Sequence, residues 1–117
     1  MLDVVHAGSD HSCCFTKSYG RYAEGTGSVL IPPDRLPMLD AAYDQVRQLS
    51  EDEAKLAVLR PLKIRFFTPR EVARLMGFPE EEAFSFPQDS TRIQNYRVLG
   101  NSLNVKVVAF LLGLLFK

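Results

Sequence analysis

The most constraining feature of this sequence is its apolar C-terminal segment. The run from Leu103 to Phe116 is interrupted only by Asn104 and Lys106, and its valine, leucine and phenylalanine side chains would surround a helix rather than form a stripe along it. A helix that is apolar all round is buried all round. The rest of the chain predicts only short helices and strands, which can cover one side. We therefore expect an uncovered apolar patch, a feature that marks interfaces, and self-association of the isolated chain.

A membrane anchor is the alternative reading of the same run. A spanning helix needs roughly 17–25 apolar residues, which is more than this run provides. The segment Met1–His6 also lacks the basic start and long apolar stretch of a signal peptide. We therefore expect no membrane association.

The chain length and composition are those of one modest domain. The chain has 117 residues with 14 basic and 14 acidic side chains, so its formal net charge is zero. A strongly basic nucleic-acid-binding protein is not visible in these totals, although a local patch is still allowed. The two cysteines, Cys13 and Cys14, are adjacent and offer no disulfide framework, which favours a reducing compartment.

Helix signals follow the proline-rich boundary IPPDRLP. Apolar residues at helical spacing predict a helix over 39–49. Ser50 and Glu53 predict a capping box at the start of a second helix that stops at Pro61. LKIRFF predicts a short strand. Thr68 and Glu71 then predict a second capping box, for a helix that Gly77 ends.

The remaining segments are predicted to be less regular. Residues 1–31 indicate short strands and turns, with CCFT prone to extended structure. FSFPQDSTRIQNY is predicted to be a loop whose phenylalanines reach the core. Gly100-Asn101-Ser102 precedes the last helix, and Asn and Ser are favoured N-caps, so we expect this turn to cap a helix beginning near Leu103. The free N–H groups of a helix start also favour a carboxylate or phosphate.

Catalytic and metal-binding patterns are scarce. His6 and His11 fall short of the three or four ligands that a metal site needs, so no metal site is predicted. Cys14 lacks an evident activating base, and Gly25-Thr26-Gly27 is better explained by a turn than by a phosphate-binding loop. No catalytic residue is predicted in this chain.

Two basic clusters admit two interpretations. Lys17 and Arg21 alternate with Tyr19 and Tyr22, which combines phosphate-binding charges with rings on which bases stack. The second cluster comprises Lys63, Arg65, Arg70 and Arg74. RNA contact and an ordinary solvated surface explain both clusters equally well, because the net charge favours neither.

Three segments in order resemble one family. RFFTPREVARLMGFPEEEAFSFP resembles the ninth conserved motif of the cytosine-C5 methyltransferases, and YRVLGNSLNVKVVAFLL resembles the tenth. CFTKSYGRYAEGTGSVL resembles the signature of the branch that methylates tRNA-aspartate. The resemblance covers most of the chain from about Cys14 onward.

The resemblance implies an α+β, helix-rich fragment. Residues 1–31 would form the extended part of a target-recognition domain, and residues 32–99 its helical part with the ninth motif. Residues 100–117 would form the tenth-motif helix, which in the family packs on a Rossmann-like α/β methyltransferase domain. The last helix is therefore expected to dock on such a domain or to self-associate. The expected localisation is cytoplasmic, nuclear or both.

The resemblance also implies a set of site residues. In the complete enzyme, S-adenosylmethionine would lie against Asn101, Ser102 and Leu103, whereas this chain alone would bind it weakly or not at all. The residues implied for contact with tRNA are Cys14, Phe15, Thr16, Lys17, Tyr19, Tyr22, Arg65 and Arg70.

The family's catalytic motifs are missing from this sequence. There is no Pro-Cys nucleophile, no Glu-Asn-Val and no Phe-x-Gly-x-Gly cofactor loop. The sequence therefore predicts a C-terminal fragment or short isoform that is inactive alone. The alternative is a non-catalytic module, derived from such an enzyme, that binds RNA or a protein partner.

Overall fold

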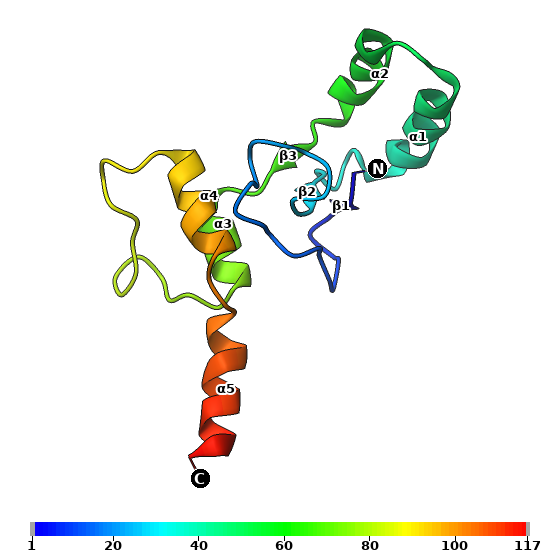
Figure 1. The fold of residues 1–117 in the computed structure, drawn as a ribbon. Coiled ribbons are helices and arrows are strands. Elements are labelled where there is room, and N and C mark those ends of the chain that lie inside the picture. The colour runs from blue at the N-terminus through cyan, green and yellow to red at the C-terminus, as the bar shows by residue number, and fades with distance from the viewer. Residues whose placement is uncertain (1, 117) are drawn as a thin grey trace.

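The structure, a computed structural model, describes residues 2–116 as a small helix-rich α+β fold (Figure 1). Its strands are β1 (Val4–Val5), β2 (Val29–Leu30) and β3 (Arg65–Phe66). Its α-helices are α1 (Leu39–Gln48), α2 (Asp52–Leu59), α3 (Pro69–Leu75), α4 (Arg92–Gly100) and α5 (Val105–Leu115). Short 3-10 turns cover Leu36–Met38 and Arg60–Leu62.

A three-stranded sheet joins the two ends of the molecule. The strand order is β1-β2-β3, with β1 parallel to β2 and β2 antiparallel to β3. Val29 pairs with Val4 on one side and with Phe66 on the other. The sheet thereby carries the chain from the N-terminal segment to the start of α3.

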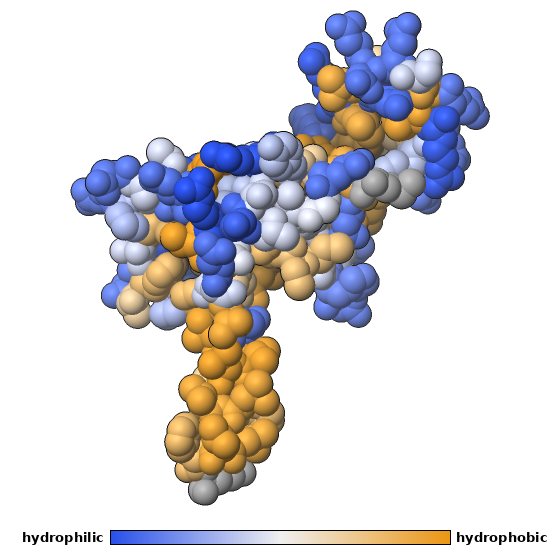
Figure 2. Space-filling view, in the orientation of Figure 1, coloured by the Kyte–Doolittle hydropathy of each residue, from blue (hydrophilic) through white to orange (hydrophobic). Residues whose placement is uncertain are grey.

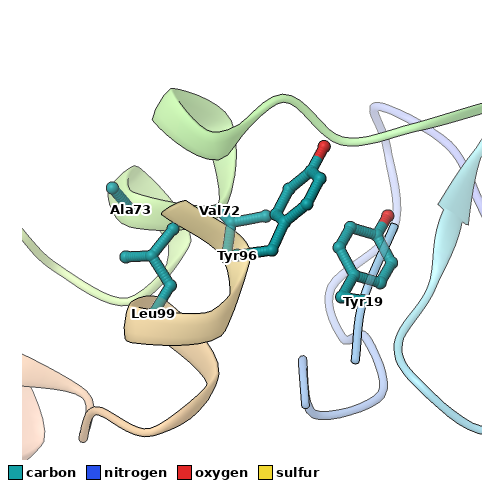
Figure 3. Close-up of a cluster of buried hydrophobic side chains, with 5 residues drawn as sticks. All are labelled: Tyr19, Val72, Ala73, Tyr96 and Leu99. Atoms are coloured by element: carbon teal, nitrogen blue, oxygen red, sulfur yellow. The ribbon is translucent and has the colours of Figure 1, made fainter. Parts of the chain in front are cut away.

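Two separate clusters of buried side chains hold the fold together. The larger lies where α3, α4 and the segment before β2 meet, and Figure 3 shows its five buried members: Tyr19, Val72, Ala73, Tyr96 and Leu99. The smaller lies beneath α1 and comprises Ile31, Ala42 and Leu62. Figure 1 shows that the α1–α2 hairpin and α5 project from opposite ends of the molecule.

The molecule is extended for its length. Its radius of gyration is 16.9 Å, whereas a compact domain of this size would have about 13 Å. The difference arises because the α1–α2 hairpin and α5 both project from the body of the molecule (Figure 1). Figure 2 shows the uncovered apolar surface of α5. Phe116, at the far end, is 79% exposed.

Several sequence expectations are confirmed. Thr68 accepts a hydrogen bond from the Glu71 amide, and the Glu71 side chain accepts one from the Thr68 amide, so the predicted capping box forms. The helix predicted over 39–49 is α1, and the strand predicted in LKIRFF is β3. Gly77 follows α3 with φ 79°, as a helix-terminating glycine should.

Three expectations about helix starts are wrong. Helix α2 has Glu51 as its N-cap without a side-chain capping bond, because it begins one residue later than the Ser50 box requires. The segment expected to be a loop instead contains the first part of α4, which a capping box of Thr91 and Gln94 begins. The N-cap of α5 is Asn104, whose Oδ1 accepts from the Val107 amide at 3.1 Å.

The segment CCFT is not a strand. The Cys13 amide donates to Ser28 Oγ and the Thr16 amide donates to the Thr26 carbonyl, at 2.8 Å each. These isolated hydrogen bonds fix a loop rather than a ladder.

One stretch, Arg92–Leu115, is long and apolar enough to cross a membrane by length and composition, with a mean hydropathy of 1.8 over an 18-residue window within it. It consists of α4 and α5, which the non-helical residues 101–104 separate. Helix α5 alone has 11 residues, whereas a span needs about 20. This stretch is therefore weak evidence for a membrane span.

The Thr68 capping box yields a test of local stability. Thr68→Ala removes the side-chain acceptor at the start of α3, which should lower the free energy of unfolding by about 1 kcal/mol. Urea denaturation measures this difference. Ser85→Ala, in an exposed loop position, should change it by less than about 0.5 kcal/mol. Equal effects of the two substitutions would contradict the assigned role of the cap.

Candidate functional site

The turn between α4 and α5 presents the residues expected to contact a cofactor. Asn101, Ser102 and Leu103 are all exposed, Leu103 to 69%. The amide of Asn101 donates to the Arg97 carbonyl at 3.2 Å, and that of Ser102 donates to the Leu99 carbonyl at 3.0 Å. These amides complete the end of α4, so they do not form the anion-binding helix start that the sequence suggested.

An apolar groove of about 530 Å³ extends from this turn along α5. Its lining residues are Phe78, Asn101, Ser102, Leu103, Val105, Val108, Ala109 and Leu112. Among the described lining residues, Asn101 and Ser102 alone have polar side chains, and none is charged. This part of the groove offers an apolar wall with hydrogen-bonding groups at one end.

The segment from Phe15 to Gly27, called the recognition loop below, folds around a buried tyrosine. Tyr19 is 1% exposed, and its hydroxyl donates to the Ser28 carbonyl at 2.6 Å and accepts from the Phe67 amide at 2.9 Å. Burial raises the pKa of Tyr19 to about 12. Its ring is enclosed in the core, so Tyr19 supports the loop and does not present a stacking surface.

The other residues expected to contact substrate divide into two groups. Phe15 packs edge-on against Tyr19 and Phe67, with ring centroids 5.0 and 5.6 Å apart. Thr16 is half-buried, and its Oγ1 accepts from the Ser18 amide at 3.3 Å. Residues facing solvent are Cys14, Lys17 and Tyr22.

The recognition loop and the α4–α5 turn meet at Gly100. A Cβ on Gly100 would lie 2.6 Å from Lys17 Cα and closer still to the Lys17 amide nitrogen. This helical position therefore needs glycine because of the close approach of the loop backbone. A hollow of about 380 Å³ opens here, and its lining includes Cys14, Phe15, Ser102 and Leu103.

This hollow brings together residues that the sequence assigned separately to cofactor and substrate. Sequence reasoning treated Gly100 as part of a cap and missed its contact with the loop. A glycine in the last turn of a helix could have indicated this contact, but α4 itself was not predicted from the sequence.

Arg65 and Arg70 have partners within the ninth-motif region. Arg65 forms a two-pronged ion pair with Glu71, with nitrogen–oxygen distances of 2.8 and 3.1 Å. Arg70 donates to the Phe84 carbonyl at 2.9 Å, and its guanidinium lies 5.5 Å from the centre of the Phe84 ring. Both arginines therefore organise the start of α3 and the loop after it.

The second basic cluster is largely neutralised. Arg74 contacts both carboxylate oxygens of Glu80, with Nε–Oε1 at 3.0 Å, and Arg65 is paired with Glu71. Each arginine holds the pKa of its carboxyl partner below the ordinary glutamate value, for Glu71 to about 2. The pairing leaves little free positive charge for phosphate in this cluster.

The histidines lie apart from this site. His11 Nδ1 is 2.7 Å from Asp10 Oδ1, and this contact raises the pKa of His11. Among residues 2–116, no three histidine, cysteine or acidic side chains lie close enough to hold a metal ion.

The chain belongs to the C-5 cytosine-specific DNA methylase family, whose sequence profile matches residues 12–117. A tRNA (cytosine(38)-C(5))-methyltransferase from Bos taurus is 50% identical over 115 residues, which cover 98% of this chain and 28% of that protein. The Homo sapiens enzyme of the same description is 47% identical over 117 residues, covering 100% of this chain and 29% of that protein.

Solved structures agree with this assignment. A DNMT2 mutant from Spodoptera frugiperda superposes with a TM-score of 0.87 at 38% identity, covering 99% of this chain and 34% of that one. The Dnmt2 methyltransferase of S. pombe superposes with a TM-score of 0.71 at 38% identity, covering 97% of this chain and 31% of that one. The chain therefore spans less than a third of the length of the two curated relatives described above.

Gly100 and Gly113 provide a matched test of the loop contact. Gly100→Ala should lower the free energy of unfolding by roughly 1–3 kcal/mol, because the added methyl group overlaps the Lys17 backbone. Gly113 has nothing within 4 Å of the equivalent position. Gly113→Ala should therefore be neutral or stabilising by up to about 1 kcal/mol. Urea denaturation measures both values, and equal effects would contradict the close approach.

The Arg65–Glu71 pair yields a pH dependence. The pKa of Glu71 is about 2 in the folded chain and 4.5 in the reference state, so the stabilisation is complete above about pH 4.5 and is lost as the pH falls toward 2. Glu71→Gln should remove this dependence, so its stability should converge with that of the unsubstituted chain in acid. Urea midpoints across this range test the prediction. Glu82→Gln, at an exposed position, removes one carboxylate but keeps the Arg65–Glu71 pair, so this control should retain the acid loss of stability.

Proposed function

We propose that this chain is the C-terminal part, or a short form, of an S-adenosylmethionine-dependent tRNA cytosine-C5 methyltransferase, with tRNA-aspartate as its expected substrate. One observation carries the proposal. The recognition loop and the α4–α5 turn line a single hollow, in a chain that matches tRNA methyltransferases along its whole length. The chain would contribute substrate recognition and one wall of the cofactor pocket.

The α4–α5 turn fits a partial role in cofactor binding. Cytosine-C5 methyltransferases use S-adenosylmethionine, which supplies the transferred methyl group. Asn101 and Ser102 offer hydrogen bonds to its methionine part, and Leu103 offers an apolar contact. The charged carboxylate and ammonium of the cofactor need further partners, because this wall carries no charge. Binding by this chain alone should therefore be weak.

The apolar surface of α5 supports docking on a methyltransferase domain. Leu111, Leu112, Leu114 and Leu115 are all exposed, so burying them offers a large hydrophobic gain. In this arrangement residues 1–31 and 32–99 form the recognition lobe, and residues 100–117 belong to the methyltransferase domain. Self-association through the same surface is the competing outcome when that domain is absent.

A non-catalytic module is the second candidate function. The sequence contains no Pro-Cys, Glu-Asn-Val or Phe-x-Gly-x-Gly motif, and the solvent-facing Lys17 and Tyr22 suit contact with RNA. The two candidates differ in whether a separately supplied catalytic domain restores activity.

Reconstitution tests the proposed function. The purified chain should transfer no methyl group from S-adenosylmethionine to tRNA-aspartate. Co-expression with the bovine relative truncated before its matching segment should form a complex that does transfer it, measured by incorporation of labelled methyl groups into tRNA. Turnover by the chain alone would contradict the predicted inactivity, and failure of the two parts to associate would contradict docking.

Two leucines of similar exposure control this experiment. Leu112 on α5 is 48% exposed, and Leu56 on α2 is 52% exposed. Leu112→Glu should abolish complex formation, whereas Leu56→Glu should leave it unchanged. An inactive complex that nevertheless forms through α5 would favour the non-catalytic module.

A further inference from the structure

The recognition loop lies along α4. At one end of the contact, the Lys17 backbone meets Gly100. At the other end, a Cβ on Gly20 would lie 2.6 Å from the Tyr96 ring and 3.4 Å from Ile93. The loop therefore follows α4 from the end of the helix toward its start.

Three exposed cations border this contact and are called the basic seam: Lys17, Arg21 and Arg97. Lys17 adjoins Gly100, Arg97 lies one helical turn before it, and Arg21 follows Gly20. Within residues 2–116, none of the three forms an ion pair. They differ in this respect from Arg65 and Arg74, which carboxylates neutralise.

The local charge is positive although the chain is neutral. The recognition loop and α4 together carry four cations, the fourth being Arg92, and one carboxylate, Glu24. Figure 2 shows strongly hydrophilic side chains over α4, and also over the α1–α2 hairpin. Cations without carboxylate partners attract a polyanion, and phosphate contacts of this kind depend on salt.

An exposed aromatic ring adds a second recognition element. Tyr22 follows Arg21 and is 65% exposed, in contrast to the buried Tyr19. Bases of single-stranded nucleic acid stack on such rings while neighbouring cations hold the phosphates. An acidic protein surface would use the cations but would have no aromatic base to place on the ring.

We propose that the basic seam binds the phosphate backbone of a single-stranded RNA segment while Tyr22 stacks on one of its bases. The choice of RNA over other polyanions rests on the proposed function. The inference adds Arg21 and Arg97 to the residues expected to contact the substrate, and it places part of that contact on α4 rather than on the loop alone.

Binding of a labelled oligouridine to the full 117-residue chain tests the basic seam. Fluorescence anisotropy is measured over a series of salt concentrations. The triple variant Lys17→Gln, Arg21→Gln, Arg97→Gln should bind at least about tenfold more weakly and should reduce the slope of log K against log salt by about 2, because each single-strand phosphate contact contributes about 0.7. Tyr22→Ala should weaken binding by about fivefold or more, with little change in that slope.

Control variants separate the basic seam from general charge and from misfolding. Arg47→Gln with Arg60→Gln removes two exposed cations of the α1–α2 lobe and should leave affinity within about twofold. Circular dichroism verifies that each variant is folded, and single substitutions replace the triple variant if it is not. Equal losses in seam and control variants, or equally tight binding of polyglutamate, would overturn the proposal.

The reconstituted complex distinguishes this inference from the proposed function. Seam variants that keep their RNA affinity while the complex methylates tRNA would overturn the basic seam alone. Seam variants that lose RNA affinity, in a chain that never forms an active complex, would support the basic seam and contradict the proposed function.

Discussion

The Tyr19 hydroxyl links parts of the chain that are far apart in sequence. It donates to the Ser28 carbonyl and accepts from the Phe67 amide, which is 48 residues away. A buried polar group without partners is costly, and these two bonds satisfy the tyrosine and both backbone groups at once. The ring packs edge-to-face with Phe66 and Tyr96, each with its centroid 5.0 Å away. The recognition loop, β3 and α4 are thereby held around one side chain.

The position of the α4–α5 turn follows from this core. Tyr96 lies beside Tyr19, and its own hydroxyl donates to the Phe67 carbonyl, so α4 is fixed against the segment that begins α3. Gly100 then allows the recognition loop to approach the end of α4. Side chains that the sequence placed in two separate sites therefore share one hollow. The loop cannot shift far along α4 without disturbing the packing around Tyr19.

Sequence signals were reliable where one local interaction decides the structure. The Thr68 capping box and the terminating Gly77 predicted α3 because both act within a single turn. The equivalent box of Thr91 and Gln94 was equally readable, yet proline and serine in the preceding segment suggested a loop. Asn104 was overlooked as an N-cap because Asn101 and Ser102, three and two residues earlier, offered the same chemistry. Alternation of aromatic and basic residues could not reveal that Tyr19 is buried while Tyr22 is exposed, since burial depends on α3 and α4.

The exposed α5 was predictable for a different reason. Its side chains are apolar on every face, so coverage depends on how much other protein is available rather than on any local signal. The chain provides two small cores, at α3–α4 and beneath α1, and neither reaches the apolar faces of α5. The hydrogen bond and the close packing that tie α5 to the body in the described part of the chain lie at its first turn. The Val105 amide donates to the Met76 carbonyl at 2.8 Å, and Lys106 packs against Gly77. A helix anchored at one end and apolar along its length gains stability from a surface that the described residues do not supply, and this requirement is the physical basis of the proposed docking on a second domain.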